Sequence, residues 1–256
     1  MKIFMMGDST MKFNNILTYP QTGWGQVVEL FVTEGVTVVD YAENGRSTKS
    51  FISEGRFERI LNEMSEGDYV ICQFGHNDEK KNDPTRYTEP YGEYQKNLGY
   101  FHDEVIKRGG HIVYATSITR HKFIDGKCIN SHGEYPKAML DFCKENNYTC
   151  IDLNKLTIDL YNELGEEASK KFHMIFPANK FSTYLEGKDD HSHLVYEGAI
   201  AIAELFVRAI YKTNDPIKKL FLDLDVTPEI DWAKGLIWLP FSLVWAIILQ
   251  ILILLI

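Results

Sequence analysis

Residues 2–10, KIFMMGDST, decide the fold of this chain. The apolar run from Lys2 to Met6 has the length and composition of a buried strand, and Gly7 lets the backbone turn sharply where the run ends. Such a turn would raise Ser9 above the edge of a sheet, where its hydroxyl can meet a substrate. The same residues are also typical of a helix cap. We expect Ser9 to be a nucleophile whose partners come from the rest of the chain.

Short runs rich in apolar, β-branched and aromatic residues alternate with helical patterns through the first 210 residues. The predicted strands are 2–6, 36–41, 69–74, 111–116 and 149–153. The predicted helices are 25–33, 51–64, 91–108, 135–146, 156–164 and 196–211. Alternation of this kind predicts an α/β fold: a three-layer α/β/α sandwich around a five-stranded parallel sheet. Three long loops are expected to carry function, at 78–90, 119–133 and 171–190.

The composition limits the possible partners. A chain of 256 residues is long enough for one sizeable α/β domain with its own core. The net charge of -9 argues against nucleic acid, because binding to phosphates requires a basic face. The four cysteines form no CxxC pair and no zinc-binding spacing, so the sequence predicts no metal site.

The two ends of the chain differ in character. We expect no signal peptide, because the first strand begins at once, and we therefore expect the protein at the cytoplasmic face. Residues 236–256 carry no charge and are long enough to span a bilayer. This hydrophobic C-terminal helix is either a membrane anchor or a segment packed on protein. The sequence thus predicts a catalytic domain at 1–212, a linker at 213–235 and the helix at 236–256.

Polar, glycine-containing turns follow the first three predicted strands. Ser9 lies in the first, Gly45 in the second and Asn77 in the third. Because the carboxyl ends of parallel strands share one edge of the sheet, these turns should face a common site. A hydroxyl together with several N–H donors suits acyl transfer, since the tetrahedral intermediate places negative charge on one oxygen.

A serine hydroxyl needs a base, and the sequence offers two acid–histidine pairs near residue 190. The spacing Asp190-x-x-His193 can place the carboxylate against one imidazole nitrogen and leave the other for Ser9. The rival pair is Asp189 with His191. We expect Asp190 and His193 to act, with the helix at 196–211 fixing their position.

The blocks Gly7-Asp8-Ser9, Gly45, Gly75-x-Asn77-Asp78 and Asp190-x-x-His193 occur in the order of the SGNH (GDSL-type) hydrolase superfamily, which this chain resembles over about residues 1–210. The rhamnogalacturonan acetylesterase branch is the most similar, through the stretches GDSTM, GWG, AENGRSTKSF, EGRF, QFGHND, HGEYPKAM and IDL. One departure lies at 117–122, where that branch tends to carry a Pro and paired arginines.

The resemblance implies a flavodoxin-like fold and specific roles. Ser9 is implied as the nucleophile, His193 as the base and then the acid, and Asp190 as the residue that orients His193. The oxyanion hole is implied to consist of the Ser9 N–H, the Gly45 N–H and the Asn77 side chain. No metal or organic cofactor is implied.

Four further residues are candidates for substrate binding. Arg46 and Arg120 could hold a sugar carboxylate, although solvated surface charge explains such residues equally well. Trp24 could stack on a sugar ring, or pack in the core. His76 could contact the substrate or support the site from within its own turn.

These observations favour a serine esterase that removes small acyl groups, most simply acetyl groups, from a carbohydrate. An esterase acting on lipid or other small esters is an alternative. A metallo-phosphoesterase would also use Asp, His and Asn. A non-catalytic sugar-binding protein on a membrane tail is a third alternative, although a binder needs no Asp–His pair.

Overall fold

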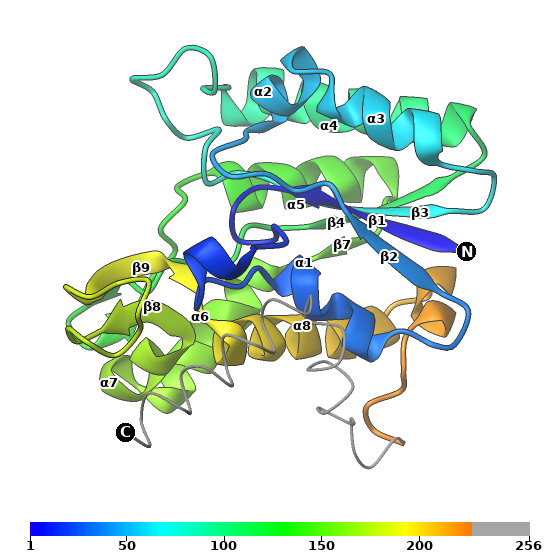
Figure 1. Ribbon diagram of the computed structural model, residues 1–256. Coiled ribbons are helices and arrows are strands. Elements are labelled where there is room, and N and C mark those ends of the chain that lie inside the picture. The colour runs from blue at the N-terminus through cyan, green and yellow to red at the C-terminus, as the bar shows by residue number, and fades with distance from the viewer. Residues whose placement is uncertain (227–256) are drawn as a thin grey trace.

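Five parallel strands form the central sheet of the computed structural model, which describes residues 1–226 (Figure 1). The strands lie in the order β2-β1-β3-β4-β7. Their bounds are β1 (Lys2–Gly7), β2 (Thr37–Asp40), β3 (Tyr69–Gln73), β4 (His111–Ala115) and β7 (Cys150–Ile151). The chain first runs to one edge and then reverses past β1, so β1 and β3 flank the switch point where open α/β sheets bind ligands.

Helices cover both faces of the sheet, as the alternating pattern predicted (Figure 1). One face is covered by α2 (Thr48–Ser53), α3 (Arg56–Glu63), α4 (Gln95–Lys107) and α5 (Tyr135–Asn146). The other is covered by α1 (Trp24–Val27), α6 (Leu153–Leu164) and α8 (Tyr196–Tyr211).

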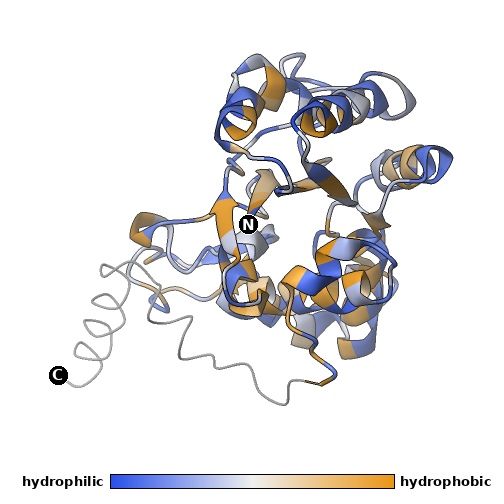
Figure 2. Cartoon of the chain, turned by 90° about the vertical axis from the view of Figure 1, so that its right-hand side faces the viewer, coloured by the Kyte–Doolittle hydropathy of each residue, from blue (hydrophilic) through white to orange (hydrophobic). Residues whose placement is uncertain are grey.

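The side chains of β1 alternate between the two cores. Phe4 and Met6 pack with the first set of helices, while Ile3 and Met5 pack with the second. All four are fully buried, so β1 is apolar on both faces, as a central parallel strand must be. Figure 2 shows hydrophobic residues gathered along the strands and hydrophilic residues on the outer parts of the helices.

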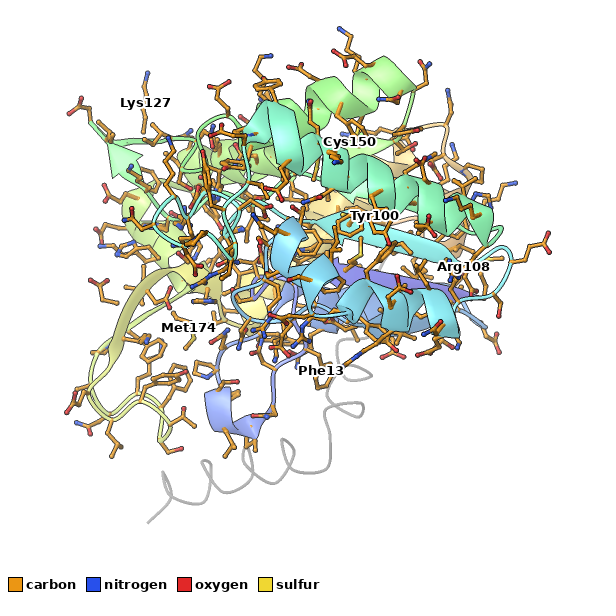
Figure 3. The ribbon with its side chains drawn as sticks, turned by 90° about the horizontal axis from the view of Figure 1, so that it is seen from above. Phe13, Tyr100, Arg108, Lys127, Cys150 and Met174 are labelled. Carbon is orange, nitrogen blue, oxygen red and sulfur yellow. The ribbon has the colours of Figure 1, made fainter. Side chains whose placement is uncertain are left out.

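The remaining elements are short and lie mostly outside the sheet. Two antiparallel hairpins are formed by β5 (Phe123–Ile124) with β6 (Lys127–Cys128), and by β8 (His173–Phe176) with β9 (Lys188–Leu194). Lys127 extends outward from the edge of the molecule (Figure 3). The short helical segments are η1 (Ile16–Thr18), η2 (Val28–Phe31), η3 (Pro90–Tyr94), α7 (Glu166–Ser169), η4 (Lys170–Phe172) and η5 (Pro216–Leu220).

Two predicted elements were wrong in part. The helix predicted at 51–64 is two helices, because Gly55 adopts φ 66° and interrupts the turn between α2 and α3. The loop predicted at 171–190 is largely the β8–β9 hairpin. Strand β8 is short and buried, whereas β9 is polar and half-exposed and lacks the apolar signal on which strand prediction depends.

The linker predicted at 213–235 was also wrong in its first part. Ile217 and Phe221 are buried against the core. Phe221 forms an antiparallel bridge with Val32, and the Leu222 N–H donates to the Phe31 carbonyl at 2.7 Å. Apolar side chains thus attach this segment to the domain, although proline and acidic residues surround them.

The predicted hydrophobic helix at 236–256 lies outside the described residues and stays a prediction. Within residues 1–226, none of the helices combines the length and the apolar composition that a membrane span requires.

Candidate active site

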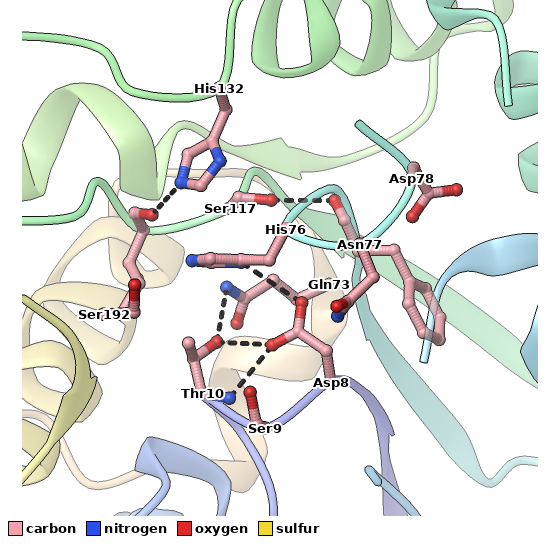
Figure 4. A network of polar contacts seen from close by, with 12 residues as sticks. Asp8, Ser9, Thr10, Gln73, His76, Asn77, Asp78, Ser117, His132 and Ser192 are labelled. Atoms are coloured by element: carbon pink, nitrogen blue, oxygen red, sulfur yellow. Dashed lines mark hydrogen bonds and ion pairs between the residues drawn. The ribbon is translucent and has the colours of Figure 1, made fainter. Parts of the chain in front are cut away.

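Ser9 lies in a tight turn directly after β1, at the carboxyl edge of the sheet (Figure 4). The preceding Asp8 is fully buried, and its carboxylate accepts hydrogen bonds from the Thr10 N–H and the Thr10 hydroxyl, both at 2.9 Å. A side chain at Gly7 would lie only 2.8 Å from the Gln73 carbonyl oxygen. The turn therefore requires glycine, and Asp8 holds it in place while Ser9 stays partly accessible.

His193 and Asp190 form a hydrogen-bonded chain with Ser9. His193 Nε2 lies 3.0 Å from Ser9 Oγ, and His193 Nδ1 lies 2.7 Å from Asp190 Oδ2. Asp190 Oδ1 accepts from the backbone N–H groups of Ser192 and His193, at 2.9 and 3.1 Å. The structure thus brings together the three side chains that the spacing predicted. An imidazole held on both sides in this way can take a proton from a hydroxyl.

The Asp190 carboxylate is held in its charged form. Burial alone would raise the pKa of Asp190, but the hydrogen bond and charge of His193 and the two backbone N–H groups lower it well below its usual range. A carboxylate that stays ionised fixes the proton of His193 on Nδ1. This leaves Nε2 free to accept a proton from Ser9.

The rival pair also forms, but away from the nucleophile. His191 Nε2 lies 3.0 Å from Asp189 Oδ1, and His191 Nδ1 lies 2.9 Å from the His121 carbonyl oxygen. Both ring nitrogens of His191 are therefore engaged elsewhere, and of these two histidines it is His193 that reaches Ser9.

Three N–H donors predicted for an oxyanion hole lie on the turns after β1, β2 and β3. Within residues 1–226, neither the Ser9 N–H nor the Gly45 N–H has an acceptor. Gly45 adopts φ 73°, a conformation that glycine reaches without strain. Asn77 donates one Nδ2 hydrogen to the Arg46 carbonyl at 3.1 Å, which leaves the second hydrogen for a ligand.

Asp78 connects two of these turns. Its buried carboxyl accepts hydrogen bonds from the Thr48 backbone N–H at 3.1 Å and from the hydroxyls of Thr48 and Thr88 at 2.5 and 2.9 Å. Burial raises the pKa of Asp78 to about 7, against the opposing effect of these hydrogen bonds. The start of α2, which follows the Gly45 turn, is thereby attached to the turn that carries Asn77.

His76 belongs to a second, buried acid–histidine pair. Its Nδ1 lies 3.1 Å from Asp8 Oδ2, and its ring packs edge-on against His132 at 4.2 Å between centroids (Figure 4). Burial alone would raise the pKa of Asp8, but the charge and hydrogen bond of His76, with those from Thr10, lower it. His76 Nε2 is buried and has no partner within residues 1–226. The ring therefore supports the nucleophile turn through Asp8, and its contact with substrate stays a prediction.

Two other predicted substrate-binding residues are engaged within the protein. Trp24 is fully buried; it packs on Phe206 and donates its indole N–H to the Gln73 side chain. Trp24 therefore has no exposed ring face on which a sugar could stack. Arg120 forms an ion pair with Glu79 at 2.5 Å and contacts three segments of the chain, so its cation is already paired within the protein.

Arg46 keeps partial access to solvent. Its Nε donates to Glu54 at 2.9 Å, and its side chain is 30% exposed. Arg46 lines a groove of about 330 Å³ beside Gly45. A substrate could reach it there only in competition with Glu54.

Arg86 is a residue that the sequence did not single out. Its Nη1 lies 3.5 Å from both the Gly45 carbonyl oxygen and Asn77 Oδ1, and its Nε donates to Asp83 at 2.5 Å. Arg86 therefore contacts both residues, Gly45 and Asn77, whose N–H groups are predicted oxyanion donors. It lies within the polar loop 78–90, and no local pattern distinguishes it from its charged neighbours.

A parallel sheet of this order, with serine, histidine and aspartate in line at its carboxyl edge, defines a hydrolase of the SGNH class. The chain belongs to the GDSL-like lipase/acylhydrolase family, whose family model matches residues 3–206. It is accordingly a carboxylic ester hydrolase.

Two relatives from Bacillus subtilis share most of their length with this chain. It is 38% identical over 218 residues to rhamnogalacturonan acetylesterase RhgT, covering 85% of this chain and 92% of that protein. It is 33% identical over 215 residues to the probable rhamnogalacturonan acetylesterase YesY, covering 84% of this chain and 94% of that protein.

Solved structures share the fold. The Bacillus subtilis protein YxiM matches with a TM-score of 0.70 at 24% identity, over 82% of this chain and 56% of that chain. The acetylxylan esterase Axe2 of Geobacillus stearothermophilus matches with a TM-score of 0.57 at 15% identity, over 82% of this chain and 93% of that chain.

Proposed function

We propose that this chain removes acetyl groups from a carbohydrate through an acyl-enzyme formed on Ser9. The observation that carries the proposal is the continuous chain of hydrogen bonds from Ser9 Oγ through His193 to Asp190, at 3.0 and 2.7 Å. A serine hydroxyl is a weak nucleophile until a base removes its proton, and this arrangement supplies the base.

The first half of the reaction forms the acyl-enzyme. Ser9 Oγ attacks the ester carbonyl while His193 Nε2 takes the hydroxyl proton, and the charged Asp190 stabilises the imidazolium. The tetrahedral intermediate collapses as His193 returns the proton to the leaving sugar hydroxyl. Water then repeats the sequence against the acetyl–Ser9 ester, which releases acetate.

The negative oxygen of both intermediates is the charge that the site must stabilise. We assign that task to the N–H groups of Ser9 and Gly45 and to the Asn77 carboxamide, because each has hydrogen-bonding capacity that residues 1–226 leave unused. Fixed donors of this kind cost no reorganisation during the reaction.

Acetylated carbohydrate is proposed as the substrate class because relatives in sequence are named for rhamnogalacturonan acetylesterase activity and a neighbour in fold is named an acetylxylan esterase. The half-exposed Arg46, in its groove beside Gly45, offers a cation for a sugar carboxylate.

Purified protein tests the proposal when given p-nitrophenyl esters of rising chain length and acetylated rhamnogalacturonan and xylan oligosaccharides. We expect acetate to be the preferred acyl group and at least one acetylated oligosaccharide to release acetate. Faster hydrolysis of long acyl esters would favour a lipid substrate instead. Binding of sugar without hydrolysis would favour a binding protein, and loss of activity on chelation would favour a metal-dependent phosphoesterase.

A fluorophosphonate probe tests the nucleophile directly. We expect it to label the wild type and the control Ser53→Ala, and to leave Ser9→Ala unlabelled. Equal labelling of Ser9→Ala would remove Ser9 from the mechanism.

We also propose that residues 236–256, which lie outside the described residues, hold the protein at the cytoplasmic face of a membrane. The proposal is based on 21 consecutive residues without charge. Deletion of 236–256 should move the protein from the membrane fraction to the soluble fraction. Recovery of the full chain in the soluble fraction would contradict the proposal.

A further inference from the structure

The strand that carries His193 is joined to the loop that follows β4. The His121 N–H donates to the His191 carbonyl oxygen at 2.8 Å, and His191 Nδ1 lies 2.9 Å from the His121 carbonyl oxygen. Strand β9 belongs to a separate hairpin and has no partner in the main sheet. The position of His193 relative to the sheet edge therefore depends on contacts of this kind.

Arg120 extends from this joint and contacts three segments with one guanidinium group. Its Nε donates to Ser192 Oγ on β9 at 3.1 Å. Its Nη1 donates to the Ser131 carbonyl oxygen at 3.2 Å and lies 3.3 Å from His132 Nδ1. Its Nη2 donates to Glu79 Oε1 at 2.5 Å and to the His76 carbonyl oxygen at 3.5 Å.

The segments that Arg120 joins each hold part of the reaction site. Ser192 immediately precedes His193, and the contacts at positions 76 and 79 enclose Asn77 in the sequence. Figure 4 shows Ser192 and His76 facing the same space, with His132 above them. One rigid, planar group thus connects the proton acceptor of Ser9 with the segment that bears an oxyanion donor.

The chemistry of arginine suits this place better than that of lysine. A guanidinium donates from three nitrogens in a fixed fork, whereas an ammonium is a single point of charge. The side chains of Arg120 and Glu79 are only 21% and 20% exposed, and the pair is reinforced by His132. The guanidinium is therefore poorly placed to bind a substrate. Any effect of Arg120 on the reaction must act through the protein groups to which it donates hydrogen bonds.

We propose that Arg120 is a positioning residue which, through the hydroxyl of Ser192, sets the location of His193 relative to Ser9 and Asn77. This inference rests on the proposed function, because it assumes that His193 is the base and Asn77 a donor. Breaking the Arg120–Ser192 contact should allow β9 to shift, and small displacements of a reacting group are costly to the rate.

The matched variants Ser192→Thr and Ser192→Val test the proposal, since they share a shape and differ in the hydroxyl. The readouts are kcat and KM on p-nitrophenyl acetate, with thermal unfolding measured alongside. We expect Ser192→Val to lower kcat about tenfold with KM and unfolding temperature nearly unchanged, and Ser192→Thr to retain most of the wild-type kcat.

A second set of variants locates the effect. In an Arg120→Lys background the difference between Ser192→Thr and Ser192→Val should disappear, because the donor to the hydroxyl is gone. If Arg120→Lys does not fold, the Thr and Val variants in the wild-type background still decide the question. p-Nitrophenyl acetate carries no sugar or carboxylate, so a change in its kcat cannot come from lost substrate recognition.

Failure takes two distinguishable forms. Equal kcat values for the Thr and Val variants, whether wild-type or reduced, would overturn the positioning role while leaving the esterase proposal intact. A wild type that neither hydrolyses esters nor reacts with a fluorophosphonate at Ser9 would overturn the proposed function and this inference together.

Discussion

Two aspartate–histidine pairs flank Ser9, and they differ in almost everything except their chemistry. Asp190 and His193 lie on a half-exposed hairpin strand, with side chains 22% and 29% exposed. Asp8 and His76 lie behind the nucleophile, with side chains 0% and 6% exposed. The first pair places a nitrogen 3.0 Å from Ser9 Oγ, whereas the free nitrogen of the second is buried without a partner in the described part of the chain.

The difference shows that position, and not residue type, decides whether a histidine acts as the catalytic base or only supports the nucleophile turn. Both carboxylates are held charged by their histidines. Only His193 faces both the hydroxyl and the solvent from which substrate arrives. His76 instead forms a hydrogen bond with the carboxylate that the nucleophile turn buries at Asp8. Without such a partner, a buried carboxylate would stay charged only at a large desolvation cost.

Replacement of each histidine by glutamine tests this contrast most severely. His193→Gln should lower kcat by about 10⁶-fold, the scale found when a triad histidine is removed. His76→Gln should lower kcat by no more than about tenfold, because it removes support and not the proton acceptor. The measurement is hydrolysis of p-nitrophenyl acetate. Comparable losses in the two variants would make the buried pair part of the proton transfer.

Replacement of the two aspartates by asparagine should affect activity in one case and stability in the other. Asp190→Asn should lower kcat by about 10⁴-fold, because the amide no longer selects the productive tautomer of His193. Asp8→Asn should instead mainly destabilise the fold, by about 3 kcal/mol or more, since it removes the buried carboxylate that binds His76 and both Thr10 donors.

The pH dependence of unfolding provides the control for Asp8. Its pKa is lowered in the folded state, so its contribution to stability is present above the unfolded value of 3.8 and is lost as pH falls through the folded value. The gap in unfolding temperature between wild type and Asp8→Asn should therefore narrow on acidification. A gap that stays constant with pH would show that the charge of Asp8 is not what stabilises the turn.

Asn77 sharpens the comparison because it neighbours His76 in sequence. Asn77→Ala should lower kcat by about 10²–10³-fold, the usual loss for one oxyanion donor, with little change in stability. Asn146→Ala, on the exposed end of α5, is the matched control and should leave kcat unchanged. An active Asn77→Ala enzyme would limit the hole to backbone donors.

Asp40 gives the test with the smallest expected effect. It is a buried carboxyl that, unlike Asp8 and Asp190, is not paired with a histidine within residues 1–226. Burial raises its pKa to about 8, and its Oδ2 lacks a partner in the residues described. A raised pKa costs stability progressively as pH rises from the unfolded value of 3.8 to about 8. Asp40→Asn should therefore raise the unfolding temperature by about 2–4 °C near neutral pH and less in acid. A lower unfolding temperature at neutral pH would mean that the carboxyl is compensated.

The turns at the sheet edge could be predicted because their signals are local. An apolar run followed by Gly7 and Asp8 determines both a buried strand and its exit. Parallel strands then place Ser9, Gly45 and Asn77 at one edge without further information. Helices α5 and α8 were predicted with their observed bounds, because each has a clear apolar face.

The rest depends on contacts between distant segments. Among the described strands, β9 pairs with β8 alone, and its composition is polar, so nothing in it indicates a strand. Trp24 is buried because α1 packs on the core through the face that carries it. Arg120 is paired because the 119–133 loop places it beside Glu79. Single residues such as Arg86 acquire their role from the Gly45 turn, which is far away in the sequence.

The hydrogen bond between Ser9 and His193 spans 184 positions of the chain. Contacts of such separation close late, because the intervening polypeptide must first be ordered. The nucleophile turn can form as soon as the first strands pair, yet it stays inert until the hairpin near residue 190 docks. Recovery of esterase activity during refolding should consequently lag behind recovery of the helical circular dichroism signal. Ester hydrolysis would then report when the hairpin has docked on the sheet.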